Sequence, residues 1–518
     1  MILKTTHLTV AYHQGYLRYI KSGNEELVRM IYTAVRDQHW LTASMTISKE
    51  KIVQDEHAFK ITYEAKYTLN AIEYFANVEI IGSPDDTISF HFIGKSNCDF
   101  LRNRIGICVH HPIQECIGQS VEIIQGDGSS MVSVFPKLIA PHQPFKNIQQ
   151  LIWKTPDQVQ ARLEFEGDIF ETEDQRNWTD NSFKTYSTPL SIPFPVAVKK
   201  GDSVEQKVIL AVTNANSIDA VLNDEHALET RFAFPSIGYA KSNHTLSIDQ
   251  VELLNQIIID HYRVEIKFEN DWEKRLKTAI DEAGLLDTKI ELAVFFDAYT
   301  NEYALLKEVL NAAVSSIIIL QNTAVVPDQC LLDFVIPAIK ADFPHIKTGA
   351  GTDVFFAELN RNRITDGRLD FVSFSINPQV HLNDDETLIE NLAAQQYCIQ
   401  TIRSFTKLPI HISPVTLKPR GFPALSIDAR QHTDFIANWT ALTLKYLAGA
   451  AQITFYETIG EKGIINTNGQ SPVYELLKKI AAFKPKFIIK STAPNPLKED
   501  ELVLENDRGE RKIFEISF

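Results

Sequence analysis

Three side chains in this sequence have the chemistry of an acid/base catalyst and lie at or just beyond the ends of short apolar runs: Glu358, Glu457 and His381. Two carboxyl groups that are partly desolvated and repel each other have pKa values that move apart, which leaves one acid and one base near neutral pH. A single acid at such a position is as often the partner of an arginine or lysine in a structural network. The two glutamates together favour catalysis, and His381 is either a general base or a hydrogen-bonded loop histidine.

Other polar side chains follow the same kind of apolar run and are candidates for binding a substrate. Alternation along a strand places Asn360 on the same side as the glutamate two residues before it, and Asn377 shares a face with two serines of its own run. Arg420 places a guanidinium group just beyond another run. Asp297 and Glu269 end two earlier runs and are weaker candidates of the same kind.

A second group of candidates lies between Phe165 and Tyr186, where acids are interleaved with aromatic residues. Aromatic rings stack on the C–H faces of sugars, and carboxylates accept hydrogen bonds from hydroxyl groups. A surface that carries Trp178, Phe183 and Tyr186 therefore predicts carbohydrate contact, with a solvated acidic loop as the alternative. The substrate-binding candidates in this segment are Asp174, Asn177, Trp178 and Lys184.

The residues from Pro235 onward repeat a short apolar strand followed by a long amphipathic stretch, which is a βα pattern. Eight such strands over about 245 residues match a (β/α)8 TIM barrel, in which the active site lies at the carboxyl ends of the strands. A doubly wound sheet is the alternative, but no G-x-G-x-x-G follows a strand. The predicted strands are 237–240, 263–268, 290–296, 316–320, 348–358, 371–377, 410–414 and 452–457. The predicted helices are 272–283, 301–313, 327–341, 387–404 and 433–447.

The segments on either side of the predicted barrel have a different pattern. Up to residue 234, short runs alternate apolar and polar residues and end near Gly, Pro, Asn or Asp, which predicts an antiparallel β-sandwich. One stretch there, 25–32, is predicted as a helix. After a helix over 473–482, three short strands at 487–491, 501–505 and 512–516 are expected to pack on the barrel or to join the N-terminal domain. The expected domains are 1–234, 235–483 and a C-terminal β segment, 484–518.

The composition excludes several classes of function. Lys plus Arg number 51 against 66 Asp plus Glu, a formal net charge of −15, so nucleic acid is a poor partner. No apolar run reaches the roughly 18 to 20 residues of a membrane span, and no secretory signal is visible. The five cysteines form no C-x-x-C pair. We expect a cytoplasmic protein that acts on a small molecule without a cofactor or a metal.

Seven segments, in order, resemble the D-apionate lactonase family and span from about residue 34 to about residue 463. The resemblance implies hydrolysis of D-apionolactone, the lactone of a branched-chain aldonic acid, to D-apionate in bacterial use of the plant sugar apiose. It also implies an N-terminal β domain, a barrel and a C-terminal β domain. It assigns no catalytic residues, so the candidates above rest on barrel geometry. The segments are 101–106, 141–145, 165–186, 357–363, 377–381, 413–420 and 456–458.

Lactone opening requires a base for the attacking water, a donor for the tetrahedral oxyanion and an acid for the leaving ring oxygen. Either Glu358 or Glu457 is the expected base and the other the acid, with His381 as the alternative base. No G-x-S-x-G elbow is present, which disfavours a serine nucleophile. A metal-assisted route stays open through the acids and His381, although no ligand spacing requires it. The expected oxyanion donors are Asn360, Asn377 or Arg420.

Two other functions remain open at this point. A retaining glycoside hydrolase also uses two barrel glutamates, about 5 to 5.5 Å apart. In its familiar form the acids lie on strands four and seven, with Asn before the acid, whereas here they are expected on strands five and eight, and Ala357 precedes Glu358. A non-catalytic sugar-binding protein is the third possibility, and it predicts binding that survives alanine at both glutamates.

Overall fold

The structure is a computed structural model, in which residues 1–214, 229–420, 427–466, 469–490 and 500–518 are described. The chain divides into two compact units. One comprises Met1–Gln175 and Ser182–Glu225, and the other comprises Arg176–Asn181 and His226–Phe518. The short segment Arg176–Asn181 therefore belongs with the C-terminal part of the chain, although its neighbours in the sequence do not.

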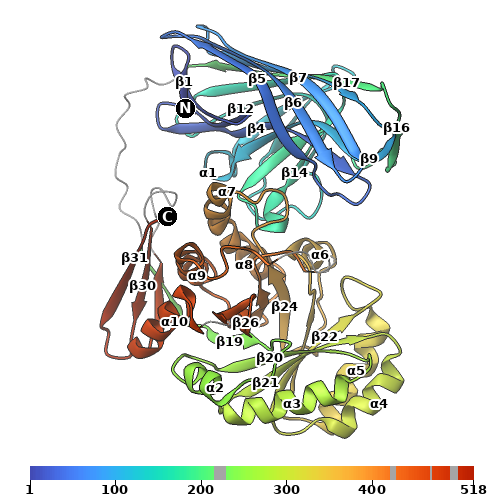
Figure 1. The fold of residues 1–518 in the computed structure, drawn as a ribbon, viewed down its shortest axis with the longest axis vertical. Helices are drawn as coiled ribbons and strands as arrows, with labels where there is room; N and C mark the ends of the chain where they lie inside the picture. The colour runs from blue at the N-terminus through green and yellow to red at the C-terminus, as the bar shows by residue number, and fades with distance from the viewer. Residues whose placement is uncertain (215–228, 421–426, 467–468, 491–499) are drawn as a thin grey trace. The chain divides into compact units, whose positions relative to one another are not determined.

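The N-terminal unit is built from antiparallel strands around an apolar interior, which confirms the predicted β-sandwich class (Figure 1). Strands β6 and β7 bury every second side chain, as the period-two pattern predicts. The strands are β1 (Ile2–Lys4), β2 (Leu8–His13), β3 (Tyr16–Ser22), β4 (Glu25–Asp37), β5 (Ser44–Gln54), β6 (Phe59–Leu69), β7 (Ile72–Gly82), β8 (Thr87–Ser96), β9 (Phe100–Pro112), β10 (Ser120–Gln125), β11 (Ser130–Val134), β12 (Phe145–Lys154), β13 (Gln160–Glu166), β14 (Phe170–Asp174), β15 (Ser182–Tyr186), β16 (Val196–Val198) and β17 (Ser203–Thr213). Between them lies the short helix α1 (Ile113–Cys116).

The helix predicted over 25–32 is wrong, because these residues begin strand β4. This strand pairs in antiparallel fashion with β3 on one side and β9 on the other. Nearly every side chain of β4 is buried, including Glu25 and Glu26, so burial does not follow the alternation that marks a half-exposed strand. Without that alternation, the local sequence does not distinguish a strand from a buried helix.

The C-terminal unit contains the predicted barrel, whose eight parallel strands close when the last pairs with the first. Its strands carry apolar residues on both faces, as parallel strands covered by helices do. Helices α3, α4 and α5 run along the outside of the strands (Figure 1). The strands are β19 (Ser236–Ala240), β20 (His261–Lys267), β21 (Lys289–Phe296), β22 (Val314–Gln321), β23 (Lys347–Gly351), β24 (Phe371–Ile376), β25 (Ile410–Val415) and β26 (Gln452–Ile459), followed by the short β27 (Gly463–Asn466) and β28 (Gly469–Gln470).

The helices of this unit follow the strands, and four of those described begin at a side-chain cap, namely α2, α5, α7 and α10. The side chains of Asp328, Asp384 and Ser471 accept hydrogen bonds from backbone N–H groups in the first turns of α5, α7 and α10. The single helix predicted over 387–404 is divided into α7, a short 3-10 turn at Asn391–Ala394 and α8. The helices are α2 (Ile248–Leu254), α3 (Trp272–Leu285), α4 (Tyr299–Val309), α5 (Gln329–Asp342), α6 (Phe356–Arg361), α7 (Asp385–Glu390), α8 (Gln395–Arg403), α9 (Asp434–Tyr446) and α10 (Pro472–Phe483).

The fifth barrel strand is shorter than the predicted strand over 348–358. Strand β23 ends at Gly351, where a Cβ atom would lie 1.7 Å from the carbonyl oxygen of Ser373 on the neighbouring strand. A loop follows, and the apolar residues after it form helix α6, in which Phe356, Ala357 and Leu359 are buried. The expectation that Glu358 and Asn360 end this strand is therefore wrong, and both residues lie on α6.

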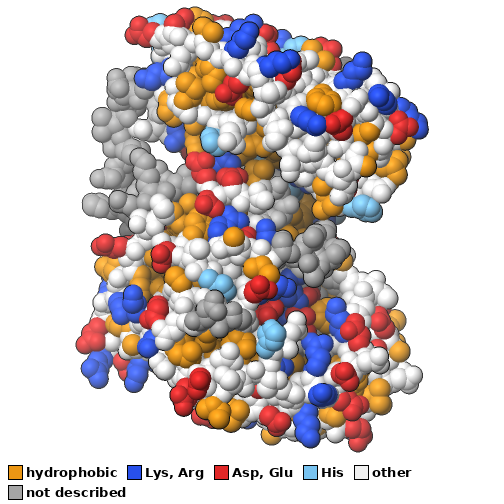
Figure 2. Space-filling view, in the orientation of Figure 1, with side chains coloured by type: hydrophobic (Ala, Val, Ile, Leu, Met, Phe, Trp, Pro, Cys, Tyr) orange, Lys and Arg blue, Asp and Glu red, His pale blue; other side chains and the backbone are white. Residues whose placement is uncertain are grey.

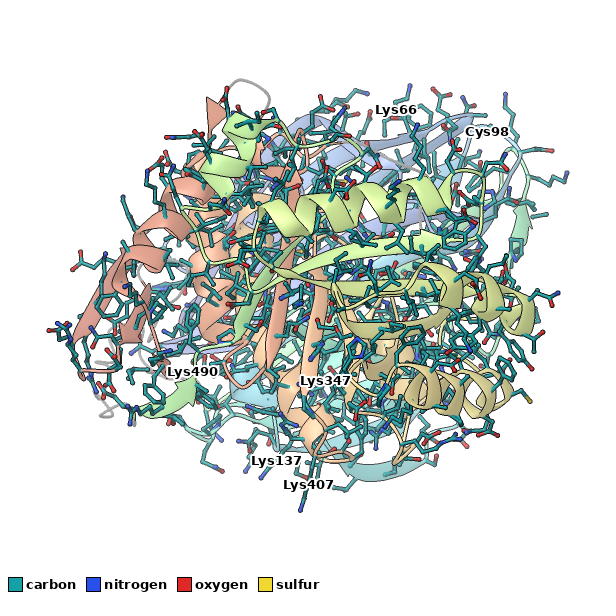
Figure 3. The ribbon with its side chains drawn as sticks, turned by 90° about the horizontal axis from the view of Figure 1, so that it is seen from below. Lys66, Cys98, Lys137, Lys347, Lys407 and Lys490 are labelled. Atoms are coloured by element: carbon teal, nitrogen blue, oxygen red, sulfur yellow. The ribbon has the colours of Figure 1, made fainter. Side chains whose placement is uncertain are left out.

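The C-terminal strands form a small antiparallel sheet together with a strand that precedes the barrel. Strand β18 (Thr230–Ala233), which the predicted boundary at residue 234 assigns to the N-terminal domain, pairs with β29 (Phe487–Lys490). The sheet continues through β30 (Asp500–Glu505) and β31 (Arg511–Ile516) and packs on α9 of the barrel unit. The ammonium group of Lys445 on α9 pairs with the buried Asp500. On β29, the labelled Lys490 donates a hydrogen bond of 2.7 Å to Gln396 (Figure 3).

Basic and acidic side chains are interspersed on the face of the molecule shown in Figure 2. In the described part of the chain, no helix is both long enough and apolar enough to cross a membrane.

Candidate active site

A cavity of about 560 Å³ lies at the carboxyl-terminal side of four neighbouring barrel strands, β25, β26, β19 and β20. This is the end of the barrel where parallel strands and their loops bring polar side chains together. Two of the residues singled out from the sequence, Glu457 and Arg420, line it. The other lining residues include Lys241, Arg263, Glu265, Arg275, Lys418, Asp428, Gln431, Tyr456 and Lys462.

Two arginines and two acids form an alternating cluster at the cavity wall. Arg263 on β20 is fully buried and donates from Nη2 to Asp353 Oδ1 at 2.7 Å, and it also contacts Glu265. Arg420, in the loop after β25, donates to Asp353 Oδ2 from Nε at 3.1 Å and from Nη2 at 2.9 Å, and it also contacts Glu265. Burial alone would raise the pKa of Glu265, but the two guanidinium groups outweigh it and hold this pKa well below its usual range.

A buried polar network on the inner faces of the strands holds Arg263 in place. Ser413 on β25 accepts a hydrogen bond of 3.0 Å from Arg263 Nε and donates one of 2.6 Å to Glu291 on β21. The other carboxylate oxygen of Glu291 lies 2.8 Å from Nδ1 of His411. Burial acts to raise the pKa of Glu291, but these partners lower it to about 2, so the group is ionised and fixes the serine hydroxyl.

Glu457 on β26 is the acid of the cavity whose protonation best suits catalysis. Burial raises its pKa, the charge of Glu265 adds to this, and the positive charges of Lys462 and Arg420 act in the opposite direction. Among the residues that the structure describes, none donates a hydrogen bond to its carboxylate. A half-buried carboxyl group with a raised pKa, facing a cavity, has the properties of a general acid or base.

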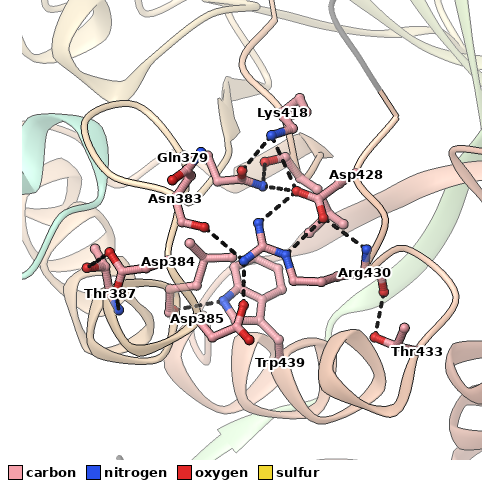
Figure 4. A network of polar contacts seen from close by, with 12 residues as sticks. Gln379, Asn383, Asp384, Asp385, Thr387, Lys418, Asp428, Arg430, Thr433 and Trp439 are labelled. Carbon is pink, nitrogen blue, oxygen red and sulfur yellow. Dashed lines mark hydrogen bonds and ion pairs between the residues drawn. The ribbon is translucent and has the colours of Figure 1, made fainter. Parts of the chain in front are cut away.

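The far wall of the cavity is held by a loop network around Asp428 (Figure 4). Arg430 donates to both carboxylate oxygens of Asp428, from Nε at 2.9 Å and from Nη2 at 2.8 Å. Arg430 also pairs with Asp385 at 2.7 Å, which ties the loop after β25 to the start of α7. Lys418 and Gln379 complete the network on the side that faces the cavity.

Glu358 and Asn360 are not brought to this cavity. The side chain of Glu358 is 22% exposed, and among the described residues its ion pair is a long one of 3.9 Å with Arg361 on the same helix. Such a contact contributes little to stability. Asn360 is buried and donates a hydrogen bond of 3.0 Å to Asn177, in the segment Arg176–Asn181. The predicted pairing of Glu358 with the glutamate of β26 therefore has no support in the geometry.

His381 lies in the loop after β24, as predicted, but in a buried cluster instead of the cavity. Its Nδ1 atom pairs with Asp180, and the ring of Trp178 meets it edge to face at 5.5 Å. Asn391 donates to the other oxygen of Asp180 at 2.7 Å. The backbone oxygen of Asn377 accepts a hydrogen bond of 2.9 Å from the hydroxyl group of Thr179, which lies in the segment Arg176–Asn181 together with Trp178 and Asp180. These contacts give His381 and Asn377 a role in holding Arg176–Asn181 against the barrel loops.

The remaining candidates also lie outside the cavity lining. Asp297 and Glu269 are exposed, and Asp297 accepts a hydrogen bond of 2.9 Å from Asn322. In the N-terminal unit, Asp174 is buried and accepts from the backbone N–H of Ala140 at 2.9 Å. Lys184 is buried too, and its ammonium group lies 2.5 Å from a carboxylate oxygen of the neighbouring strand.

The predicted aromatic surface for sugars is also wrong. Phe183 is fully buried, and Tyr186 is 5% exposed, with its hydroxyl group bonded to Glu171 at 2.7 Å. Both rings lie on β15, a strand on which every side chain is buried. Because they are three residues apart, they lie on opposite faces of the strand, and both faces are covered.

Arg263 and Glu265 were missed in the sequence although a signal for them exists. They are charged residues at alternate positions of a barrel strand whose other face, Tyr262, Val264 and Ile266, is apolar. Residues at i and i+2 of a strand share one face, so this spacing predicts that both side chains point to the same side of the barrel wall. Asp353 carries no such signal, because it lies in the loop after β23 and its role depends on contacts with Arg263 on a distant strand and Arg420 in a distant loop.

In the described part of the chain, no three His, Cys, Asp or Glu side chains are placed to hold a metal ion.

Comparison with known proteins gives a consistent result along most of the chain. Residues 1–215 match the family model described as "D-apionate lactonase, N-terminal domain", and residues 236–485 match "D-apionate lactonase, TIM barrel domain". A protein named D-apionate lactonase, from Brucella anthropi, is 28% identical over 450 residues, which are 81% of this chain and 73% of the relative.

Comparison with solved structures finds more distant matches. An α-L-arabinofuranosidase from Thermotoga maritima is 12% identical, with a TM-score of 0.35, over 57% of this chain and 79% of its own. An arabinofuranosidase from Xanthomonas axonopodis pv. citri is 11% identical, with a TM-score of 0.38, over 56% of this chain and 82% of its own.

Proposed function

Because the chain belongs to the D-apionate lactonase family, it is a lactonase, and we propose that it hydrolyses D-apionolactone to D-apionate in the cavity that Glu457 and Arg420 line. The observation that carries the assignment of the site is Glu457. Among the carboxyl groups that line this cavity, Glu457 is the one whose pKa is raised. Within the described part of the chain, no donor is hydrogen-bonded to its carboxylate oxygens, so these oxygens are available to a ligand in the cavity. The cavity lies at the carboxyl end of the barrel, where enzymes of this architecture place their active sites.

Glu457 acts as the base that deprotonates the attacking water. Its raised pKa makes the carboxylate a stronger base than an exposed glutamate. Attack on the lactone carbonyl produces a tetrahedral oxyanion. Arg420 is the donor best placed to stabilise this charge, because its Nε and Nη2 atoms are fixed by Asp353 and Glu265 and the guanidinium group lines the cavity.

The same glutamate returns the proton to the leaving ring oxygen. After Glu457 has taken a proton from water, it is a neutral carboxylic acid next to the breaking C–O bond, and no second carboxyl group is required. Ring opening then yields the hydroxy acid, whose carboxylate forms at neutral pH with release of one proton to solvent. Glu265 is less suited to this step, because both guanidinium groups keep it ionised.

The rival proposal of a retaining glycoside hydrolase built on Glu358 and Glu457 loses its geometric basis. Such an enzyme needs both carboxyl groups at one glycosidic bond, about 5 to 5.5 Å apart. Glu457 lines the cavity, whereas Glu358 lies on α6 and does not.

The test is proton release at near-neutral pH with D-apionolactone and with an unbranched aldonolactone. Glu457→Gln should lose roughly 100-fold or more of the rate, since a general base contributes about 10²–10⁴-fold. Glu358→Gln is the matched control and should retain activity. Wild-type rates in Glu457→Gln, or a rate that a chelator abolishes, would contradict the mechanism. Release of a chromophore from an aryl glycoside without turnover of any lactone would contradict the function itself.

A further inference from the structure

The cavity is more basic than the protein that contains it. Six of its lining side chains are basic and three are acidic, in a chain whose net charge is −15. Apart from Arg420, which we assign to the oxyanion, a neutral lactone gives no reason for this excess of positive charge. The basic residues are Lys241, Arg263, Arg275, Lys418, Arg420 and Lys462, and the acidic ones are Glu265, Asp428 and Glu457.

Two of the acids that balance these cations lie behind the cavity surface. Lys241 pairs at 2.7 Å with Glu282, which is buried on α3 and does not line the cavity. Asp353, which joins the two arginines, is likewise not part of the lining. A ligand in the cavity therefore meets cations first and their counter-charges at a greater distance, an arrangement that favours an anion.

Lys418 is the cation whose position is best defined for such a ligand (Figure 4). The amide nitrogen of Gln379 donates to the backbone oxygen of Leu417 at 2.7 Å and to Asp428 at 2.6 Å. These two bonds leave the amide oxygen of Gln379 to face Lys418, which donates to it at 2.8 Å. The ammonium group is thus held at the cavity wall by a neutral partner.

The nearest acid does not neutralise Lys418 fully. Asp428 lies 3.5 Å from the ammonium group and already accepts two shorter hydrogen bonds from Arg430. An ammonium group has three N–H donors, so at least one remains for a ligand. The side chain of Lys418 is 33% exposed and lines the cavity, in the loop that also carries Arg420.

We propose that Lys418 forms a carboxylate subsite, so that the cavity binds the ring-opened sugar acid as well as its lactone. The inference rests on the proposed function, because it takes the reaction product as the anion. Hydrolysis converts a neutral carbonyl group into a carboxylate at the point of attack, next to Arg420. The new charge gains a charge-assisted hydrogen bond to Lys418 that the lactone cannot form to the same extent. The sugar acid therefore acts as a product inhibitor.

The test measures binding and turnover separately. The sugar acid D-apionate, its neutral alditol and inorganic phosphate are titrated by calorimetry into wild type, Lys418→Met, Lys418→Arg and Lys274→Met. Lys274 is exposed on α3 outside the cavity lining and serves as the matched control. Inhibition of lactone hydrolysis by D-apionate is measured for the same four proteins.

Lys418→Met should weaken binding of the sugar acid about 10-fold or more, which is the range of a hydrogen bond to a charged group. The KM for the lactone should change less than the inhibition constant of the acid, and Lys418→Arg and Lys274→Met should retain binding. Melting curves confirm that the variants are folded, and retained binding in Lys418→Arg separates lost charge from lost structure. Equal affinity of Lys418→Met and wild type for the acid would overturn the proposal.

Two further outcomes also decide the matter. Phosphate that binds as tightly as the acid, and equally depends on Lys418, would overturn the assignment to a sugar acid, as would equal binding of the neutral alditol. Because calorimetry measures binding of the sugar acid without turnover, it separates the subsite from the reaction. A protein that binds the acid through Lys418 but hydrolyses no lactone would support the subsite and contradict only the proposed function.

Discussion

Replacement of Arg420 by methionine tests whether the charge cluster at the cavity wall supports both the fold and the reaction. Arg420 supplies two hydrogen bonds to Asp353 and one to Glu265. Without it, Arg263 alone faces two partly buried carboxylates, and one negative charge is uncompensated. Removal of one partner from a buried ion pair costs about 3–5 kcal/mol. Asp353 and Glu265 keep some contact with solvent, so we expect a loss near the lower end, about 3 kcal/mol.

The measurement is hydrogen exchange of the peptides that contain β20 and β25, because a chain of two units has no single free energy of unfolding. A loss of about 3 kcal/mol corresponds to exchange more than roughly 100-fold faster in these strands when exchange reports opening. The double variant Arg420→Met with Asp353→Asn restores one positive to one negative charge, and it should recover about half of the protection or more.

The activity of the same two variants separates catalysis from folding. If Arg420 stabilises the oxyanion, both variants lose about 10²–10³-fold of the rate, including the double variant whose strands are protected again. A single variant with exchange close to wild type would refute the electrostatic argument. A double variant that is less protected than the single one would refute the charge balance, and a double variant with wild-type rates would refute the catalytic role of Arg420.

Two other predictions follow from shifted pKa values. The acid limb of kcat/KM should fall at a pH above the ordinary glutamate pKa of 4.5, with the rate rising as Glu457 loses its proton, and Glu457→Gln should abolish this limb in a pH–rate profile. Burial lowers the pKa of Lys490 from 10.5 to about 8, so the folded state releases a proton that the unfolded state holds, and stability should rise between about pH 8 and 10.5. Lys490→Met should remove this rise, because methionine does not titrate. It should also stabilise the C-terminal sheet at pH 7, by at most on the order of 3 kcal/mol, as measured by hydrogen exchange of β29 and β30. An unchanged rise in the methionine variant would show that another group titrates.

The barrel was predictable from the sequence because its signal is local and repeated. Each strand such as β22 is a short apolar run, and each following helix shows its own period, so the eight units and their order can be counted. Strand β23 was extended too far because Phe355 and Phe356 continue the apolar run beyond Gly351, although a loop and a helix lie there. The resulting error placed Glu358 at a strand end and led to the prediction that Glu358 and Glu457 act together as acid and base.

The candidate site was predictable only where a residue's position along a strand decides its role. Glu457 and Arg420 were found because both lie at or beyond the carboxyl end of a barrel strand. Asp353 and Lys418 act through contacts that join residues from different strands and loops, and such pairings depend on the closed barrel. The predicted sugar surface failed for a related reason, since the burial of both faces of β15 depends on neighbouring strands that the local sequence does not reveal.

The segment Arg176–Asn181 makes the barrel a discontinuous domain. Its contacts with Asn377, His381 and Asn391 span 198 to 211 residues of sequence. During synthesis this segment leaves the ribosome long before the loops that receive it, so its contacts with the barrel can form only after those loops have been made. Loop closure over such a distance costs only about 0.6 kcal/mol more than over half of it. A fragment that begins at His226 lacks the segment Arg176–Asn181. A circular permutant that retains this segment contains the whole domain.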